Sequence, residues 1–496
     1  MRVQNLLTKL AARPALVIFA CSLLLFCCGD WILPLTDRDE PRFAEASREM
    51  LQRPDYIVPW FNDAHRFDKP PLIYWAQMAC YKLLGENAFA ARLPSALFAA
   101  GTALLIFSWA RRFTKSQTAL AAAVIFTTSL QMLANAHLAT ADMPMIFFTA
   151  AAAWSGWEMT RPGAAQKWFW IFHVSLALGF LAKGPVAWLP IGGLFFGKWL
   201  RPKEFNFSTP RFAAGMILTL AIIAVWGIPA LIATNGEFFT VGIGHHVLFR
   251  SVGVLEGHGG NSWIKYVLTL PFFFVTFFFS FFPWSFCVPK ALWNWWPARG
   301  GDAFGWYLLV QAALIFLTFT FVRTKLPHYT LPAFPFIAIW LARTIPGLKF
   351  FKWAVSMVGL ILIVNIAGFL ALKPEFVSHK LFEQSKSSLK PEMKFAAFGY
   401  DEPSLVWEFR GILNNDMQTL DANQAADFAH QTNPYVLIVP TDFYKSNLTS
   451  LTNALTVQTE GINWSHPIMV AKPYVINIIK LNIKLGKVDL TAVIHR

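Results

Sequence analysis

Eleven apolar blocks, most of them long enough to cross a lipid bilayer, fill the first 372 residues of the chain. A transmembrane helix needs roughly 20 residues to span a hydrocarbon core of about 30 Å. Of the 496 residues, 55% are hydrophobic and 14% are charged, an apolar excess that a soluble fold cannot bury. The sequence therefore predicts a polytopic α-helical membrane protein. The blocks lie at residues 14–36, 88–110, 117–135, 141–159, 167–182, 185–200, 212–233, 263–287, 304–322, 329–343 and 353–372.

The number of spans is predicted as about 11 to 13, because some blocks are short and one is interrupted. The block at 263–287 contains Pro271 and Pro283, and proline breaks or bends a helix. At the N-terminus, basic residues precede an apolar run that ends near Pro34, as in a signal peptide. No small-residue cleavage site is evident, which favours a retained first span.

Lysine and arginine concentrate in alternate loops, and this pattern predicts the orientation of the chain. By the positive-inside rule, the basic loops and the N-terminus are cytoplasmic. The opposite loops hold most of the acids and histidines of the membrane domain and face outward. The formal net charge of +14 therefore reflects topology, and nucleic acid is not predicted as a partner. The outward loops are residues 37–87, 136–140, 183–185, 234–262 and 323–328.

Residues 373–496 differ in composition from the membrane domain at residues 1–372. Ser, Asn, Gln and Asp become common, and strand-like runs occur at Tyr435–Val439 and Tyr474–Ile479. We predict a small α/β domain on the outer side, since an odd number of spans precedes it. It would either shield an acceptor or pack as a cap over the outer face. The five cysteines show no spaced framework, so neither disulfides nor zinc fingers are indicated.

The first outward loop carries two charged clusters. One is the run Asp39-Glu40-Pro41-Arg42-Phe43-Ala44-Glu45, and the other is Asp68-Lys69-Pro70-Pro71-Leu72-Ile73-Tyr74-Trp75. Apolar positions after Pro41 fit a helix lying along the membrane, and Pro70 is suited to begin a second one. The simplest alternative is a solvated cluster of charges beside the membrane.

Together with four later motifs, these clusters resemble the bacterial aminoarabinose transferases that modify lipid A, and their wider relatives among protein mannosyltransferase-like GT-C enzymes. The resemblance covers the whole membrane domain. It implies a glycosyltransferase of the bacterial inner membrane, with its active site and C-terminal domain in the periplasm. The later motifs are Ala139-Thr140-Ala141-Asp142, Lys183-Gly184-Pro185-Val186-Ala187, Gly242-Ile243-Gly244-His245-His246 and Lys325-Leu326-Pro327-His328-Tyr329-Thr330-Leu331-Pro332.

The resemblance further implies an inverting transfer of sugar from a polyprenyl (undecaprenyl) phosphate to lipid A, another envelope glycan or a protein. The predicted topology favours such a donor independently. No glycine-rich loop for a nucleotide is visible, so no nucleotide cofactor is expected. An outward-facing transferase therefore needs a sugar carried by a lipid.

Four cations and one tyrosine form the predicted site for the donor phosphate. Cations stabilise the leaving phosphate because negative charge builds there in the transition state. Each cation has an alternative explanation as an interfacial residue that reaches water or lipid headgroups, and interfacial tyrosines are common. That alternative suits Lys183 least, because it lies between two apolar blocks, where ionisable groups usually line a cavity. The set is Arg42, Lys69, Lys183, Lys325 and Tyr329.

Two aspartates are the predicted catalytic residues. The resemblance carries the acid of the first motif onto Asp39, which would activate or orient the acceptor. A phosphate acceptor needs no deprotonation, so toward it Asp39 would mainly position the nucleophile. Asp142, near the outer end of a span, would either pair with a cation or cap its helix.

The resemblance also implies a divalent metal ion between two outward loops. Asp68, with His245 or His246, offers oxygen and nitrogen ligands. The aminoarabinose transferases favour Glu before the lysine, whereas Asp68 is one methylene shorter, and this departure puts the metal in doubt. The histidines would otherwise face water or bind lipid phosphate.

A secondary transporter or lipid flippase is the competing function, since charges within a membrane also mark substrate paths. A transporter would show repeated halves and charges near the midplane. Here the charges gather at one interface and no repeat is evident. A structural scaffold would leave the outward clusters unexplained. The predicted partners are therefore the lipid-linked sugar, its acceptor and membrane lipids, for a chain acting as a monomer.

Overall fold

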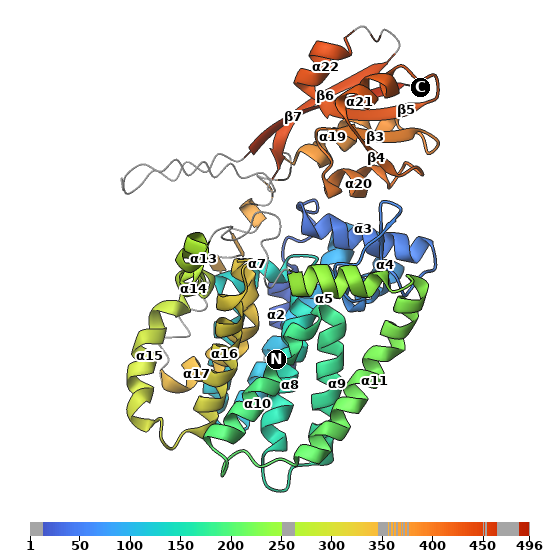
Figure 1. Ribbon diagram of the computed structural model, residues 1–496. Helices are drawn as coiled ribbons and strands as arrows, with labels where there is room; N and C mark the ends of the chain where they lie inside the picture. Colours follow the sequence, from blue (N-terminus) through green and yellow to red (C-terminus); the bar gives the residue numbers. More distant parts are fainter. Residues whose placement is uncertain are drawn as a thin grey trace, which may run out of the picture.

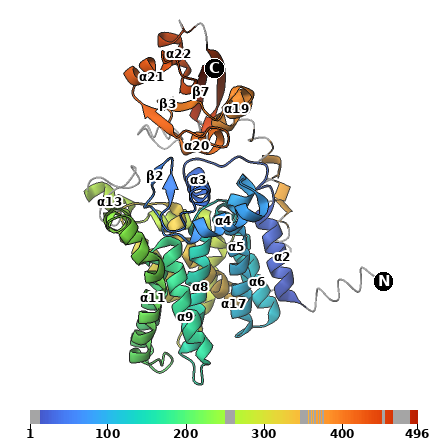
Figure 2. The same ribbon diagram turned by 90° about the vertical axis from the view of Figure 1, so that its right-hand side faces the viewer.

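The computed structural model describes residues 13–249, 263–345, a few positions between 356 and 373, and residues 376–449, 451, 454–463 and 486–495. A bundle of helices forms one part of the molecule, and a five-stranded sheet with its helices lies beyond one end of that bundle (Figure 1). Between the two lie the helices α3 (Asp39–Gln52) and α4 (Leu72–Leu84), as the second view also shows (Figure 2). We call the end of the bundle that carries α3 and α4 the outer end.

The apolar blocks form the helices of the bundle, and four predicted blocks match their helices to within one residue at each end. The first block ends early, because α2 stops at Cys27 and Gly29 then adopts a positive φ of 91°. The block at 353–372 lies largely outside the described residues. The helices are α2 (Pro14–Cys27), α5 (Ala88–Arg111), α6 (Ser116–Thr127), α7 (Leu130–Ala136), α8 (Asp142–Met159), α9 (Gln166–Lys183), α10 (Leu189–Leu200), α11 (Thr209–Ala233), α16 (Ala303–Phe321) and α17 (Phe334–Thr344).

Within the described residues, three helices are long and apolar enough to cross a membrane, namely α5, α11 and α16. The number rises to five if each of two bent helix pairs counts as one span. One pair is α6 with α7, bent by 66°, and the other joins residues 266–280 to 284–298 with a bend of 105°. The chain is a multi-pass membrane protein, whereas the count of 11 to 13 spans stays a prediction.

The two prolines of the block at 263–287 interrupt it where the sequence predicts. Helix α13 (Trp263–Thr269) ends before Pro271, which precedes α14 (Phe272–Ser280). Pro283 then precedes the 3-10 helix η3 (Trp284–Cys287), which leads into α15 (Val288–Trp295) and η4 (Trp296–Ala298). Further short helices are η1 (Pro185–Trp188), η2 (Phe238–Phe249) and η5 (Pro327–Ala333).

Helix α3 begins at Asp39, where the sequence predicts a helix lying along the membrane, and it is covered by protein on two sides. Its residues from Glu40 to Met50 are buried except for the half-buried Arg42. One side packs on α4, and the other is covered by α20 (Pro403–Phe409) of the C-terminal domain. There Arg48 donates a 3.2 Å hydrogen bond to the backbone oxygen of Trp407. In the chain segment that connects α3 to α4, β1 (Trp60–Phe61) and β2 (Ala64–His65) form a hairpin.

The C-terminal part is an α/β domain, as predicted, with the strand order β4-β3-β5-β7-β6. The predicted strand at 435–439 is the buried central strand β5, whereas the run at 474–479 lies outside the described residues. Strands β3, β4 and β5 are parallel, and β7 pairs antiparallel with β5 and β6. The elements are β3 (Lys394–Phe398), β4 (Met417–Leu420), β5 (Tyr435–Pro440), β6 (Leu455–Asn463), β7 (Gly486–His495), α19 (Val377–Ser385), α21 (Ala422–Ala429) and α22 (Thr441–Asn447).

The C-terminal domain contacts the first charged cluster directly. Asp37 accepts hydrogen bonds from the backbone nitrogen (2.9 Å) and the hydroxyl (2.5 Å) of Ser404. Next to it, Arg38 forms an ion pair with Glu402 at 3.2 Å. The segment that carries Asp39 is therefore held between the membrane domain and the C-terminal domain.

Candidate functional site

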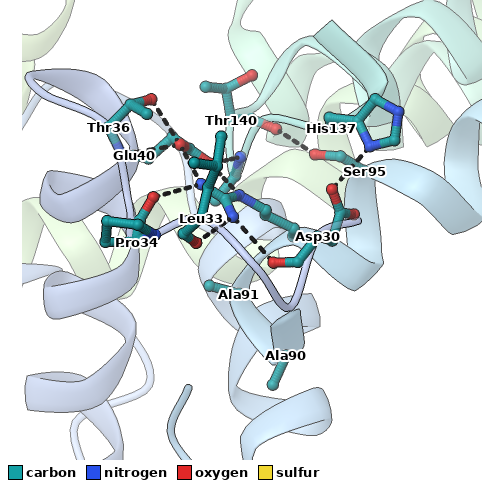
Figure 3. Close-up of polar contacts among 12 residues, drawn as sticks. Asp30, Leu33, Pro34, Thr36, Glu40, Ala90, Ala91, Ser95, His137 and Thr140 are labelled. Carbon is teal, nitrogen blue, oxygen red and sulfur yellow. Dashed lines mark hydrogen bonds and ion pairs between the residues drawn. The ribbon is translucent and has the colours of Figure 1, made fainter. Parts of the chain in front are cut away.

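A buried ion pair between Glu40 and Arg92 fixes the start of α3 to the helical bundle (Figure 3). Both carboxylate oxygens of Glu40 accept from the guanidinium at 2.8 Å. The guanidinium also donates to the backbone oxygens of Asp30, Leu33 and Pro34 at 2.8 to 3.0 Å. All five N–H donors of the arginine are therefore used, which is the condition under which a buried charge pair is tolerated.

The same carboxylate reaches the loop that precedes α8. One oxygen of Glu40 accepts from the backbone nitrogen of Ala139 at 2.9 Å, and the other accepts from Thr36. Nearby, His137 lies 2.7 Å from Asp30, so this loop is held at two points (Figure 3). Asp39 precedes Glu40 and Asp142 follows Ala139 by three residues, so one hydrogen bond draws both predicted catalytic segments together.

Asp142 and Lys183 form a second buried ion pair at the outer ends of α8 and α9. The hydroxyl of Thr140 also donates to the Asp142 carboxylate at 3.2 Å. Of the two predicted alternatives for Asp142, the structure shows pairing with a cation, and the N-cap position of α8 is occupied by Ala141 instead. Lys183 Nζ lies 6.0 Å from the centre of the Tyr329 ring, so two predicted phosphate-binding residues adjoin each other.

The second charged cluster contains a further buried arginine. Arg66 pairs with Asp68 at 2.8 Å, and its Nε donates to the hydroxyl of Tyr74 at 3.2 Å. The guanidinium also lies over the ring of Phe43 on α3, 5.2 Å from its centre. Lys69 is half-buried and donates to the backbone oxygen of Asp68 at 3.0 Å.

Apolar contacts join this cluster to the Asp142–Lys183 pair. Phe43 and Tyr74 pack in one cluster with Ala141, which directly precedes Asp142. Phe67 packs in another cluster with Leu181, which lies two residues before Lys183. Two clusters of buried side chains thus connect the segments that carry the two charged groups. We call the residues Asp39, Arg42, Arg66, Asp68, Lys69, Asp142, Lys183 and Tyr329 the outer site.

Asp39 and Arg42 lie on the first turn of α3, and their side chains are available to bind a ligand. Asp39 is exposed and Arg42 is half-buried, and neither makes a side-chain hydrogen bond or ion pair with the described residues. Asp39 lies close enough to Arg66 and Tyr74 for its charge to act on both. An exposed carboxylate beside a cluster of cations is suited to orient an incoming acceptor.

Lys325 has a different environment from the other predicted cations. Its ammonium donates to the backbone oxygens of Phe319 (3.1 Å) and Thr320, at the C-terminal end of α16. A cation here stabilises the helix end, where carbonyl groups lack partners within the helix. Its role in phosphate binding stays a prediction.

The predicted metal ligands are only partly described. Asp68 already forms an ion pair with Arg66, so a metal ion would have to compete with a guanidinium for that carboxylate. The side chains of His245 and His246 lie outside the described part. Elsewhere in the described residues, no group of three or more His, Cys, Asp or Glu side chains is arranged to hold a metal. The metal stays a prediction.

Known proteins share this arrangement of helices and outer domain. The sequence model of the family described as dolichyl-phosphate-mannose-protein mannosyltransferase matches residues 68–228. The crystal structure of ArnT from Cupriavidus metallidurans bound to undecaprenyl phosphate has a TM-score of 0.73, covering 97% of this chain and 98% of that one. This chain has the GT-C membrane fold.

Sequence relatives agree with the GT-C fold. An undecaprenyl phosphate-alpha-4-amino-4-deoxy-L-arabinose arabinosyl transferase of Pectobacterium atrosepticum is 30% identical over 353 residues, which cover 70% of this chain and 61% of that protein. The chain thus spans about three fifths of the length of that relative. The ArnT structure is 17% identical to this chain, and at that level the likeness concerns the fold. The resemblance stated from the motifs is confirmed.

Two buried arginines of the GT-C domain were not predicted from the sequence. Arg92 lies inside the predicted span 88–110, and a charge at such a position signals a buried partner. That signal was available in the sequence. Arg66 lies two residues before Asp68, and its contacts with Tyr74 and Phe43 depend on the packing of α3 against α4.

Proposed function

We propose that the chain is an inverting glycosyltransferase that moves a sugar from a polyprenyl phosphate to an acceptor at the outer end of the bundle. The observation that carries this proposal is the shared fold with a transferase that was crystallised with undecaprenyl phosphate. The names of the sequence relatives support the same chemistry, with an aminoarabinose donor in those proteins. The chain spans about three fifths of the length of the Pectobacterium atrosepticum relative.

The outer site supplies the groups that this reaction needs. Lys183 uses one of its three N–H donors on Asp142, which leaves donors for a phosphate. Lys69 and Arg42 add positive charge on the side of α3 and α4. Developing charge on the leaving phosphate is stabilised by such preorganised cations. Asp142 acts as a positioning residue, because it holds the Lys183 ammonium in place.

In this scheme Asp39 orients the acceptor, and the most suitable acceptor is a phosphate group of lipid A or another envelope glycan. A phosphate nucleophile is already ionised, so no strong base is required. The basic loops then lie in the cytoplasm of a bacterium, and the outer site and the C-terminal domain lie in the periplasm. A divalent ion on Asp68 and His245 or His246 would be detected by metal analysis of the purified protein, and no chemical step here depends on it.

The test is reconstitution of the purified chain in liposomes with undecaprenyl-phosphate sugars and lipid A. We expect sugar on the acceptor, and about a 100-fold or greater loss of transfer in Lys183→Met. Lys82→Ala, an exposed lysine of α4, serves as the matched control and should keep full activity. Movement of the lipid-linked sugar across the bilayer without transfer would establish the flippase alternative instead.

A further inference from the structure

The end of the bundle opposite the outer site contains a cavity. It has a volume of about 300 Å³ and lies between the end of α10, the start of α16 and the loop before α16. Figure 1 shows these elements at the end remote from α3, since α10 leads away from Lys183 and α16 leads toward Lys325. The cavity is therefore separate from the proposed transferase site.

The wall of this cavity is apolar, and its rim is cationic. Phe205, Trp306, Tyr307 and Val310 are its large lining side chains, together with Leu200, and Arg201 and Arg299 also line it. The Arg299 guanidinium lies over the ring of Trp296, 3.9 Å from its centre. Because the Cβ of any larger residue at Gly197 would come within 3 Å of the Phe205 ring, this glycine permits the close approach of the loop to α10.

One nitrogen of Arg201 lacks a hydrogen-bond partner. Nη2 donates to the backbone oxygen of Gly300, whereas Nη1 is buried and has no hydrogen-bond acceptor within the described residues. Glu204 forms an ion pair with Nη1 at 3.6 Å, which is too long for a hydrogen bond, and its side chain is 40% exposed. A buried cationic N–H without an acceptor is costly, so an anionic group from outside the chain fits this position.

The surroundings place the cavity at the level of membrane headgroups. Trp199, Trp293 and Trp296 expose 57 to 83% of their surface at this end, and tryptophan gathers at the interface between membrane and water. Asp302, which caps the start of α16, forms an ion pair with Arg343 at 3.0 Å. Basic pockets between transmembrane helices on the cytoplasmic side are suited to the headgroups of anionic lipids.

We propose that this cavity binds the phosphate of an anionic phospholipid on Arg201 and Arg299, with an acyl chain along Phe205, Trp306 and Val310. The lipid would fasten the loop before α16 to the end of α10. The proposal is independent of the transferase assignment, because none of these residues belongs to the outer site.

The test is native mass spectrometry of the purified full chain titrated with phosphatidylglycerol or phosphatidylcholine. We expect wild type to retain phosphatidylglycerol about 10-fold more tightly than phosphatidylcholine, and Arg201→Gln/Arg299→Gln to lose this preference. Lys115→Gln/Lys203→Gln removes two exposed charges from the same end of the bundle without touching the cavity, and it should bind as wild type does.

A second variant covers the case in which the double arginine variant does not fold. Val310→Phe fills part of the wall and keeps all charges, and it should weaken phosphatidylglycerol retention at an unchanged net charge. Equal retention of both lipids by wild type, or an unchanged preference in the arginine variant, would overturn the proposal. So would displacement of the lipid by inorganic phosphate alone, since that result would indicate a site for the free anion.

Discussion

Among the buried ion pairs at the outer end of the bundle, Glu40–Arg92 and Asp142–Lys183 differ in how completely their charges are used. Arg92 uses all five donors, on Glu40 and on three backbone oxygens, and the side chains of the pair are 3% and 2% exposed. Lys183 donates once, to Asp142, and that pair is 15% and 7% exposed. The first pair therefore holds the fold, whereas the second retains donors and access for a ligand.

The backbone positions of the two cations explain this difference. Arg92 lies one turn into α5, and its guanidinium donates to three backbone oxygens of the segment at residues 30–34. Lys183 is the last residue of α9, and Gly184 ends the helix with a positive φ of 78°. A charge at a helix end lies nearer to water and to ligands than one within the helix.

The largest effect is expected from Arg92→Met. It leaves the Glu40 carboxylate buried and unpaired, which costs about 3–5 kcal/mol. Adding Glu40→Gln should not restore stability, because three backbone oxygens still lose their donors. Thermal unfolding in detergent measures both variants. If the melting temperature of the double variant equalled that of wild type, this network would not hold the fold.

Lys183→Met should reduce transfer by about 100-fold to 1,000-fold, because a cation at the leaving phosphate is lost. Here the double variant Asp142→Asn/Lys183→Met is expected to recover the melting temperature, since no unpaired buried charge remains. Transfer should stay low. If the double variant regained transfer, the pair would have only a structural role.

Lys69→Ala is expected to have a smaller effect, a loss of about 10-fold to 100-fold that appears mainly in the KM for the donor. Lys69 is half-buried and lies beside the Arg66–Asp68 pair, so another cation partly replaces it. Steady-state kinetics with varied donor separates KM from kcat. A loss confined to kcat, at unchanged KM, would contradict binding of the donor by this residue.

The smallest effect concerns a third carboxylate, Asp37, which is held mainly by neutral donors. Burial raises the pKa of Asp37 from its ordinary 3.8 to about 7, against the hydrogen bonds from Ser404. The docked state therefore favours the protonated acid, so docking of the C-terminal domain is firmest below pH 4 and weakens as pH rises to about 7. Limited proteolysis of the segment around α20 measures this, and Asp37→Asn should flatten the profile. Identical profiles for both proteins would refute it.

Local patterns in the sequence predicted the helices but not their partners. The bounds of α5, α8, α9 and α16 follow from apolar runs that any window of the sequence reveals. Pairing of Glu40 with Arg92 joins residues 52 positions apart, and such a contact depends on packing that one sequence does not display. The burial of α3 was missed for the same reason, because α20 lies more than 300 residues later in the chain.

The site was predicted residue by residue rather than as an arrangement. Lys183 and Asp142 were each singled out, yet their pairing across 41 residues came from the structure. For Lys325 the motif predicted binding of the donor phosphate. In the structure its ammonium instead donates to backbone oxygens at the end of α16. Motifs therefore gave the candidate residues, while helix packing determined which of them retain donors for a ligand.

Binding of undecaprenyl phosphate without a sugar tests the difference between the two ion pairs most directly. The purified wild type and the Asp142→Asn/Lys183→Met variant would be titrated with this lipid, alongside their melting temperatures. We predict at least about 10-fold weaker binding by the variant at an unchanged melting temperature. Equal affinity of the two proteins would contradict a phosphate site at Lys183.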